Sequence, residues 1–140
     1  MKKRIPITQY CHERIQQMIK EPVVCIDATA GTGKDTVFLA ALVGEKGKVI
    51  AMDIQQMAVE QTKLLLKKKQ LSERAKVVLD SHVNIDQYAE KGTVSLIMFN
   101  LGYLPGGDHN LSTKAETTIE ALEKGLTMLC EGGMISLLIY

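Results

Sequence analysis

The chain has 140 residues, of which 46% are hydrophobic, and its 17 Lys and Arg side chains nearly balance 16 Asp and Glu, for a net charge of +1. A chain of this length can bury one hydrophobic core, so we expect a single domain over residues 1–140. The balanced charge excludes a strong general attraction to nucleic acid. The sequence has neither the ~20 apolar residues of a membrane span nor the apolar segment of a signal peptide.

The first half of the chain predicts alternating helices and strands. An amphipathic helix over residues 9–20 is followed by an apolar, β-branched strand over 23–27. The strand leads into a helix over 33–43. A strand over 48–53 and an amphipathic helix over 56–70 come next.

The second half continues the alternation. Short apolar runs predict strands over 75–79 and 94–99, and a helix follows over 114–130. A Thr-x-x-Glu capping box at Thr113 marks the expected start of that helix. A pair of glycines separates it from a fifth strand, which we expect to begin at Met134.

This order of elements predicts an α/β fold. Continuous apolar strands joined by helical crossovers are typical of a doubly wound, mainly parallel, Rossmann-like sheet that is covered on both faces.

The stretch VVCIDATAGTGKDT at 23–36 carries most of the functional information. It reads as a strand that ends in Asp27, a small-residue turn with Gly31 and Gly33, and the start of a helix. Glycine has no Cβ and a helix start offers free N–H groups, so backbone can approach a ligand closely there.

Four interpretations of this turn compete. A phosphate-binding P-loop needs glycine at Ala28 and a hydroxyl at Asp35, and both fail. A dinucleotide fingerprint needs a third glycine where Thr36 stands. The S-adenosylmethionine loop, acidic-x-G-x-G-x-G, fits from Asp27 onward, except that Thr29 replaces its first glycine. The fourth interpretation is a plain strand–helix turn.

A second acidic residue supports a nucleoside ligand. The run KVIAMDIQ predicts a strand that ends in Asp53, about 20 residues after Gly33, which is the offset expected for a ribose-binding acid. A carboxylate there supplies two acceptors for the two ribose hydroxyls. The alternative is a solvated aspartate at a strand end.

The remaining candidates follow the third and fourth strands. Ser81 and His82 come after the third, where they would flank an adenine ring; the alternative is a loop or N-cap histidine. Asn100 opens a glycine-rich loop after the fourth strand, where its side-chain oxygen could accept hydrogen bonds from an amine. Tyr103 in this loop could stack on a base, or belong to an ordinary turn. His12 could form a lid or simply pack an N-terminal helix.

Four segments, DATAGTGKDTVFLA, AMDIQ, DSHVNI and FNLGYLPGGD, resemble a family of small bacterial class I methyltransferases long labelled as rRNA methylases. That family includes the Gram-positive enzyme that methylates 5-aminomethyl-2-thiouridine at the tRNA wobble position. The resemblance runs from about residue 9 to the end of the chain. It implies a class I methyltransferase sheet, which normally has two strands beyond the fifth. We therefore expect this chain to be incomplete at its C-terminus.

The resemblance also implies a set of site residues. The Asn100–Tyr103 segment is similar to the N-P-P-Y loop of amino methyltransferases, with Leu101-Gly102 in place of the two prolines. We therefore expect Asn100 and Tyr103 to be catalytic. The expected cofactor-binding residues are Asp27, Ala30, Gly31, Thr32, Gly33, Asp35, Asp53, Gln55, Ser81 and His82.

The function expected from these residues and this resemblance is S-adenosylmethionine-dependent N-methylation of the aminomethyl group of wobble 2-thiouridine in tRNA. The alternatives are a small-molecule or rRNA methyltransferase, and a binding module for S-adenosylmethionine or a nucleotide without catalysis. The expected partner is tRNA, with no membrane and no metal, and a homodimer is an assembly to be tested.

Cysteine usage bears on location. Cys11, Cys25 and Cys130 are odd in number and widely spaced. This favours reduced thiols in the cytoplasm over a disulfide framework or a metal site. Cys25 falls in a buried-strand pattern and is expected in the core.

We predict that the protein binds S-adenosylmethionine and does not bind ATP, because Asp35 and Ala28 break the P-loop pattern. Calorimetric titration with each ligand tests this. Micromolar binding of ATP–Mg²⁺ without binding of S-adenosylmethionine would contradict this prediction.

We also predict that Asp53→Ala weakens S-adenosylmethionine binding by about 1–3 kcal/mol in the same titration, because the ribose hydroxyls lose charged acceptors.

Overall fold

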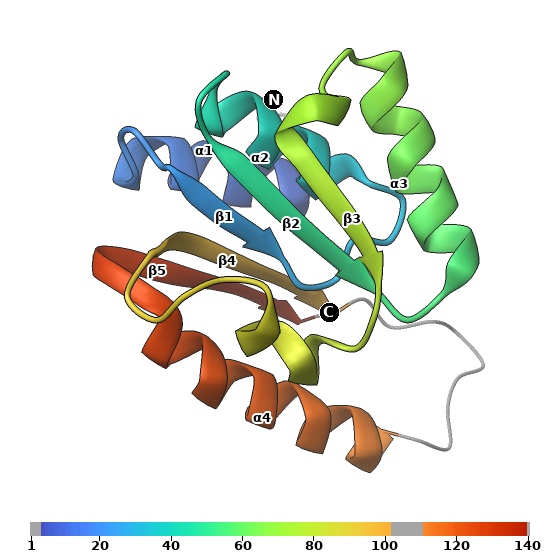
Figure 1. The fold of residues 1–140 in the computed structure, drawn as a ribbon, viewed down its shortest axis with the longest axis vertical. Helices are drawn as coiled ribbons and strands as arrows, with labels where there is room; N and C mark the ends of the chain where they lie inside the picture. The colour runs from blue at the N-terminus through green and yellow to red at the C-terminus, as the bar shows by residue number, and fades with distance from the viewer. Residues whose placement is uncertain (1–3, 102–110, 140) are drawn as a thin grey trace.

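The computed structural model describes residues 4–101 and 111–139. A five-stranded sheet in the order β3-β2-β1-β4-β5 forms its centre (Figure 1). Every pairing between neighbouring strands is parallel. The strands are β1 Val24–Asp27, β2 Lys48–Asp53, β3 Ala75–Leu79, β4 Val94–Leu101 and β5 Leu129–Ile139. The helices are α1 Ile7–Met18, α2 Lys34–Val43, α3 Gln56–Lys68 and α4 Leu111–Met128, with short 3₁₀ turns η1 Ser72–Arg74 and η2 His82–Gln87.

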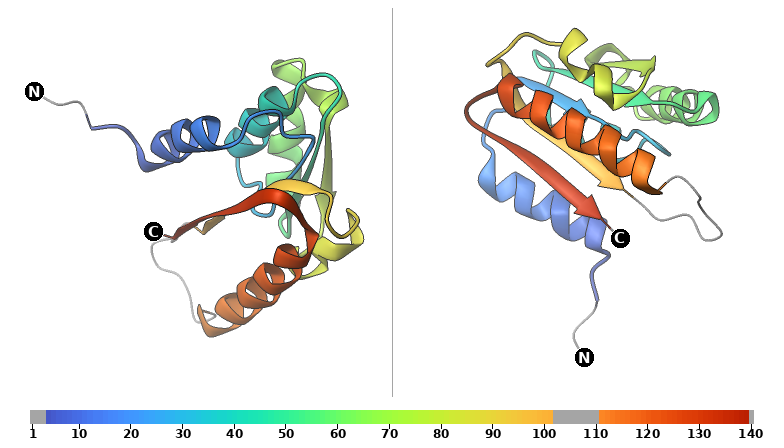
Figure 2. Two further views of the ribbon diagram at one scale, coloured as in Figure 1. Left: turned by 90° about the vertical axis from the view of Figure 1, so that its left-hand side faces the viewer. Right: turned by 90° about the horizontal axis from the view of Figure 1, so that it is seen from below.

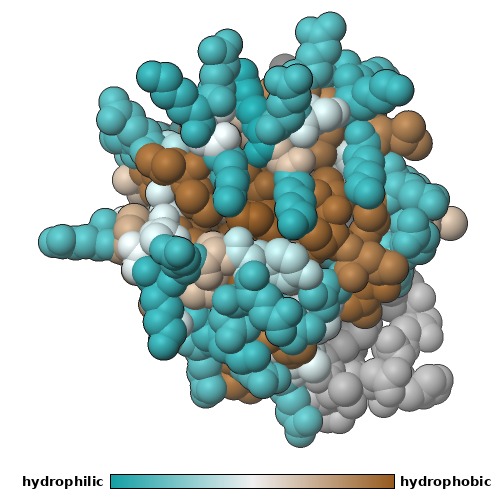
Figure 3. All heavy atoms as spheres, in the orientation of Figure 1, coloured by the Kyte–Doolittle hydropathy of each residue, from teal (hydrophilic) through white to brown (hydrophobic). Residues whose placement is uncertain are grey.

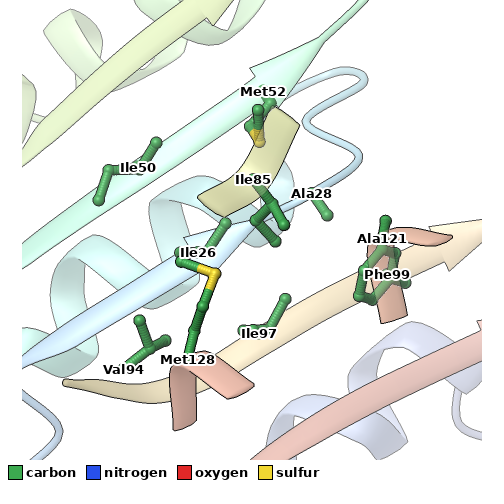
Figure 4. Close-up of a cluster of buried hydrophobic side chains, with 10 residues drawn as sticks. All are labelled: Ile26, Ala28, Ile50, Met52, Ile85, Val94, Ile97, Phe99, Ala121 and Met128. Carbon is green, nitrogen blue, oxygen red and sulfur yellow. The ribbon is translucent and has the colours of Figure 1, made fainter. Parts of the chain in front are cut away.

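Helices cover both faces of the sheet, as predicted. Helices α1, α2 and α3 lie on one face and α4 on the other (Figure 2). Successive strand residues point to opposite faces, so both sides of each central strand must be apolar. Thus Cys25, buried as expected, belongs to the cluster that contains Leu39 of α2 and Leu66 of α3. Its neighbour Ile26 belongs to the opposite cluster, with Met128 of α4 (Figure 4).

The strand order reverses direction between β1 and β4. From β1 the chain adds β2 and β3 on one side, and then crosses to add β4 and β5 on the other. The loops that leave β1 and β4 therefore diverge at the carboxyl edge of the sheet. Such a reversal is where open α/β sheets bind ligands. The residues after β1, β2 and β4 therefore lie at the edge of the sheet where a ligand would bind.

The sequence-predicted fold is confirmed, with corrections at the ends of elements. Strands 48–53 and 75–79 match β2 and β3. The predicted start of the last helix is wrong, because α4 begins at Leu111 rather than after Thr113. The Thr-x-x-Glu spacing also occurs within helices, so the spacing alone does not fix where a helix begins.

The predicted start of the fifth strand is also wrong. Strand β5 begins at Leu129, directly after α4, rather than at Met134. Val94 pairs with Leu129 and Leu96 with Met134, with a register shift between the two pairs. Gly132, whose φ is +80°, lies in this irregularity. The glycine pair therefore accommodates a bulge in the strand rather than separating helix from strand.

The short turn η2 is joined to α4 by a lysine. Lys124 Nζ lies 2.5 Å from the Val83 carbonyl oxygen and 3.7 Å from a carboxylate oxygen of Asp86. The sequence patterns did not predict η2, which has no helical periodicity because it consists of two short 3₁₀ turns that meet at the non-helical Asn84. It covers part of the α4 face of the sheet through the fully buried Ile85.

Hydrophobic residues also reach the surface. Figure 3 shows them between rows of hydrophilic side chains on the face toward the viewer. Large apolar side chains with more than half of their surface exposed include Ile54, Met57 and Leu79, which come at or just after the ends of β2 and β3. Strand β5 exposes Leu137 and Ile139.

We predict that Gly33→Ala destabilises the fold more than Gly92→Ala. Both glycines have positive φ, +92° and +73°, so both substitutions place an alanine in a conformation that L-residues rarely adopt. At Gly33, an added Cβ would also lie 2.9 Å from Thr62 Cα, where α2 and α3 approach. Among the described residues, nothing lies within 4 Å of a Cβ at Gly92. The extra crowding should cost a further ~1–3 kcal/mol in urea unfolding. Equal losses would contradict the close approach.

Candidate functional site

Three aspartates lie where the first two strands and the second helix meet. Asp27 ends β1, Asp53 ends β2 and Asp35 lies in the first turn of α2. Because β1 and β2 are adjacent and parallel, the first two carboxylates stand at the same edge of the sheet, as the sequence predicted.

The Asp27 carboxylate is buried under the glycine loop. Its side chain is 0% exposed. One oxygen accepts a hydrogen bond from the Thr36 hydroxyl at 2.6 Å, and the other accepts from the Thr29 N–H at 3.1 Å. Burial raises the pKa of this carboxyl to about 7; the Thr36 hydrogen bond opposes that rise and the negative charge of Asp35 adds to it. Asp27 therefore ties the loop to α2 rather than presenting an oxygen to solvent.

The loop itself is held against β2. The Ala30 N–H donates to the Met52 carbonyl oxygen at 2.9 Å, and the Gly31 N–H donates to Asp53 Oδ2 at 2.9 Å. Gly31 has a φ of +56°, and the nearest atom to a Cβ there is Thr29 O, 3.7 Å away. These contacts give the loop a fixed path, while its Cβ-free positions leave the backbone open to close approach by a ligand.

Asp53 is partly exposed at this edge. Besides the Gly31 N–H, it accepts the Gln55 N–H at 2.9 Å. An ionised carboxylate has about four acceptor positions, so two backbone donors leave room for two hydroxyl groups. The predicted site residues Gln55 and Thr32 are exposed beside it.

Two exposed apolar residues border the same edge and were missed by sequence reasoning. Ile54 follows Asp53 and is 69% exposed, and Leu79 pairs with Asp53 in the strand register and is 54% exposed. Exposed apolar side chains next to a polar acceptor suit a ligand with one flat apolar part and one hydroxylated part. The available signal was an isoleucine directly after a strand-ending acid.

The loop after β3 has its own hydrogen bonds. Ser81, rather than His82, caps η2, since its hydroxyl oxygen accepts the Val83 N–H at 3.3 Å. Burial lowers the pKa of His82, so its ring is neutral at pH 7. The ring lies edge-on to Phe99, with 5.5 Å between centroids, and its Nδ1 lies 3.3 Å from the Ala28 carbonyl oxygen. His82 therefore contacts the start of the glycine loop.

Asp80, to which sequence reasoning assigned no role, organises this same loop. It accepts hydrogen bonds from the Tyr88 hydroxyl at 2.6 Å and from the Asn84 amide at 2.8 Å. The Tyr88 hydrogen bond, followed by that from Asn84, holds the pKa of the Asp80 carboxyl below its usual value. The only sequence signal was its position directly after a strand.

On the other side of the loop, residues from three elements converge. Asp35 lies between His12 of α1 and Asn100 of β4. Its Oδ1 is 2.6 Å from His12 Nε2, and its Oδ2 accepts a hydrogen bond from Asn100 Nδ2 at 3.3 Å. The Asn100 N–H donates to the Thr29 hydroxyl at 2.7 Å. Asn100 Oδ1 is buried and has no hydrogen-bond partner in the described part of the chain. A small pocket adjoins these groups and is lined by Thr8, Cys11, Asp35, Met98, Phe99, Asn100, Ser136 and Leu138.

One predicted catalytic residue falls outside the described part of the chain. Tyr103 and the rest of its glycine-rich loop lie outside the described residues. Within residues 4–101 and 111–139, no group of three His, Cys, Asp or Glu side chains could hold a metal ion. Among the helices in the same ranges, none has the length and apolar content to span a membrane.

Comparison with known proteins identifies relatives. A family model described as "Putative rRNA methylase" matches residues 49–140. A curated relative from Arabidopsis thaliana, "tRNA (mnm(5)s(2)U34)-methyltransferase, chloroplastic", is 37% identical over 142 residues, covering 95% of this chain and 52% of the relative. The chain thus spans about half the length of that relative.

Solved structures agree in fold. A Clostridium thermocellum protein, described as a "putative rRNA-methylase", has a TM-score of 0.82 at 44% identity, over 96% of this chain and 72% of that one. A Streptococcus mutans "putative methyltransferase", solved "in complex with SAH", has a TM-score of 0.78 at 35% identity, over 98% and 73% of the two chains.

We predict a pH-dependent stability that originates at Asp27. Its carboxyl has an ordinary pKa of 3.8 and a folded-state pKa of about 7, so the folded state holds the proton more tightly. The resulting stabilisation is fully present below about pH 4 and is lost as the pH rises through about 7, for a total on the order of 4 kcal/mol. Unfolding of the wild type and of Asp27→Asn should be compared from pH 4 to about 8. The difference between them should change in this direction; a pH-independent difference would contradict the assignment.

Proposed function

From the premise that this chain belongs to the family described as "Putative rRNA methylase", we propose that it is an S-adenosylmethionine-dependent N-methyltransferase that acts on the 5-aminomethyl group of wobble 2-thiouridine in tRNA. The observation that carries the proposal is Asn100 Oδ1 at the carboxyl end of β4, a buried oxygen with no hydrogen-bond partner among the described residues. It is a hydrogen-bond acceptor beside the glycine loop, and an amine is a donor that would satisfy it. The tRNA substrate is supported by the Arabidopsis relative's name.

The carboxyl edge of β1 and β2 has groups suited to each part of this cofactor. The partly exposed Asp53 carboxylate would accept the ribose hydroxyls, and the exposed Ile54 and Leu79 would border the adenine ring. The Streptococcus relative, which was solved with SAH, supports this choice of ligand. In this proposal the cofactor contacts come from Ala30, Gly31, Thr32, Gly33, Asp53, Gln55, Ser81 and His82.

Two of the expected cofactor residues take indirect roles. Asp27 shapes the loop from beneath, because its carboxylate is fully buried and already paired. Asp35 is 8% exposed in its side chain and is occupied by His12 and Asn100. A buried carboxylate at Asp35 would also repel a triphosphate, which supports the choice of this cofactor over ATP.

When bound, S-adenosylmethionine supplies a methyl group on a positively charged sulfur, and the carbon–sulfur bond breaks with its electron pair kept by sulfur as the acceptor nitrogen bonds to the carbon. The chain's own contribution is positioning. Asn100 Oδ1 accepts a hydrogen of the neutral amine and thereby directs the nitrogen lone pair away from itself. The proton released after transfer goes to water. Asn100 and Tyr103 are the two catalytic residues of this proposal.

The family description favours one alternative substrate, rRNA. The same chemistry would apply, and only the acceptor would change. A homodimer and a cytoplasmic location stay predictions.

The test is incubation of the protein with isotopically labelled S-adenosylmethionine and tRNA that lacks the wobble methyl group, followed by nucleoside mass spectrometry. We expect label in the methylaminomethyl nucleoside, and none with tRNA that lacks the aminomethyl group.

Asn100→Ala should lower the single-turnover rate on the order of 10²-fold, by analogy with loss of one oxyanion-hole donor. Its affinity for S-adenosylmethionine, measured by calorimetry, should stay within about threefold.

Three outcomes would contradict the proposal at different levels. Label in rRNA but not in tRNA would overturn the substrate. Binding of S-adenosylmethionine without transfer to any RNA would overturn the reaction. An Asn100→Ala variant that transfers at the wild-type rate would remove Asn100 from catalysis.

A further inference from the structure

A hydrogen-bonded chain links the N-terminal helix to the end of β4. His12 Nε2 lies 2.6 Å from Asp35 Oδ1, and Asp35 Oδ2 lies 3.3 Å from Asn100 Nδ2. The His12 and Asp35 side chains are 22% and 8% exposed. This link joins α1, α2 and β4, and the proposed chemistry uses only its last member.

Asp35 determines which way the amide of Asn100 faces. An ionised carboxylate only accepts hydrogen bonds, so the nitrogen of Asn100 must face Asp35 and its oxygen must face away. That oxygen is the buried atom without a partner in the described part of the chain. A buried acceptor left unpaired costs about 1–3 kcal/mol, so without Asp35 the amide would gain by turning its oxygen toward another donor.

His12 in turn holds Asp35. Its imidazole Nε2 donates to the carboxylate in the protonated ring and in one neutral tautomer. The ring is fixed by a parallel stack on Phe38, with centroids 3.9 Å apart and an interplanar angle of 5°. The ring therefore has little freedom to move. Its hydrogen bond to an ionised carboxylate is charge-assisted, and such bonds are stronger than those between two neutral groups.

We propose that His12 is a positioning residue which, through Asp35, keeps the Asn100 amide oxygen directed at the acceptor amine. This inference rests on the proposed function and assigns to α1 a role at the acceptor side of the site. His12 does not contact the reacting atoms and acts only through Asp35.

The experiment compares His12→Ala with His12→Gln, whose amide retains an N–H donor. Gln16→Ala is the matched control, because Gln16 is an exposed residue one turn further along α1. Single-turnover methyl transfer is measured at saturating S-adenosylmethionine and tRNA, with cofactor affinity measured by calorimetry. We expect His12→Ala to lower the rate about 10–100-fold with cofactor affinity within about threefold. His12→Gln should recover most of the rate, and Gln16→Ala should match the wild type.

A second readout does not depend on activity. The ¹⁵N-labelled side-chain amide of Asn100 gives a pair of NMR resonances that report its hydrogen bond to Asp35. These should shift in His12→Ala and return toward their wild-type positions in His12→Gln. If the wild type transfers no methyl group, the proposed function fails, and this NMR comparison still decides whether His12 positions Asn100.

Two results would overturn the inference. The first is an Asn100 resonance pair that is unchanged in His12→Ala. The second is an equal loss of rate in His12→Ala and His12→Gln, accompanied by an equal loss of melting temperature, which would indicate a purely structural role.

Discussion

The buried carboxylate of Asp27 is the contact on which the site depends. It accepts from the Thr36 hydroxyl and the Thr29 N–H, and so closes the turn between β1 and α2. Burying a carboxylate is costly unless it is hydrogen-bonded, and its raised pKa reflects that cost. As a result, the path of the loop is fixed before a ligand binds. Thr29 then extends this order to β4, because its hydroxyl accepts the Asn100 N–H.

Two halves of the site are joined at the reversal of strand order. On one side, Asp53 of β2 holds the Gly31 N–H, which connects the loop to the ribose-binding candidate. On the other side, Asp35 connects α2 to Asn100 of β4. The glycine loop thus lies between two carboxylates, the partly exposed Asp53 and the buried Asp35. In the proposed reaction the methyl donor is already activated, so preorganisation of this kind would be the main contribution of the protein to the rate.

The sequence predicted what local patterns encode. Strand β2 was bounded correctly because polar Lys48 and Asp53 enclose an apolar run. The start of β5 was missed because a glycine pair indicates a turn as readily as a bulge, and only the pairing with β4 distinguishes them. The His12–Asp35 contact joins residues 23 positions apart, and no short-range pattern can encode it. Ile54 was missed because an apolar residue after a strand usually has no role.

Helix α1 is anchored differently from the rest of the site. Its one buried residue is Ile15, whereas α2 buries Leu39, Ala40 and Val43. Segments with few buried contacts open at lower free energy than the global unfolding of a domain. Detachment of α1 would remove His12 and leave β1, β2 and the glycine loop in place. The glycine loop and Asp53 therefore lie on the well-packed layer of α2, β1 and β2, whereas the proposed acceptor side of the site also depends on a helix with one buried residue, so the two halves can be assembled and lost separately.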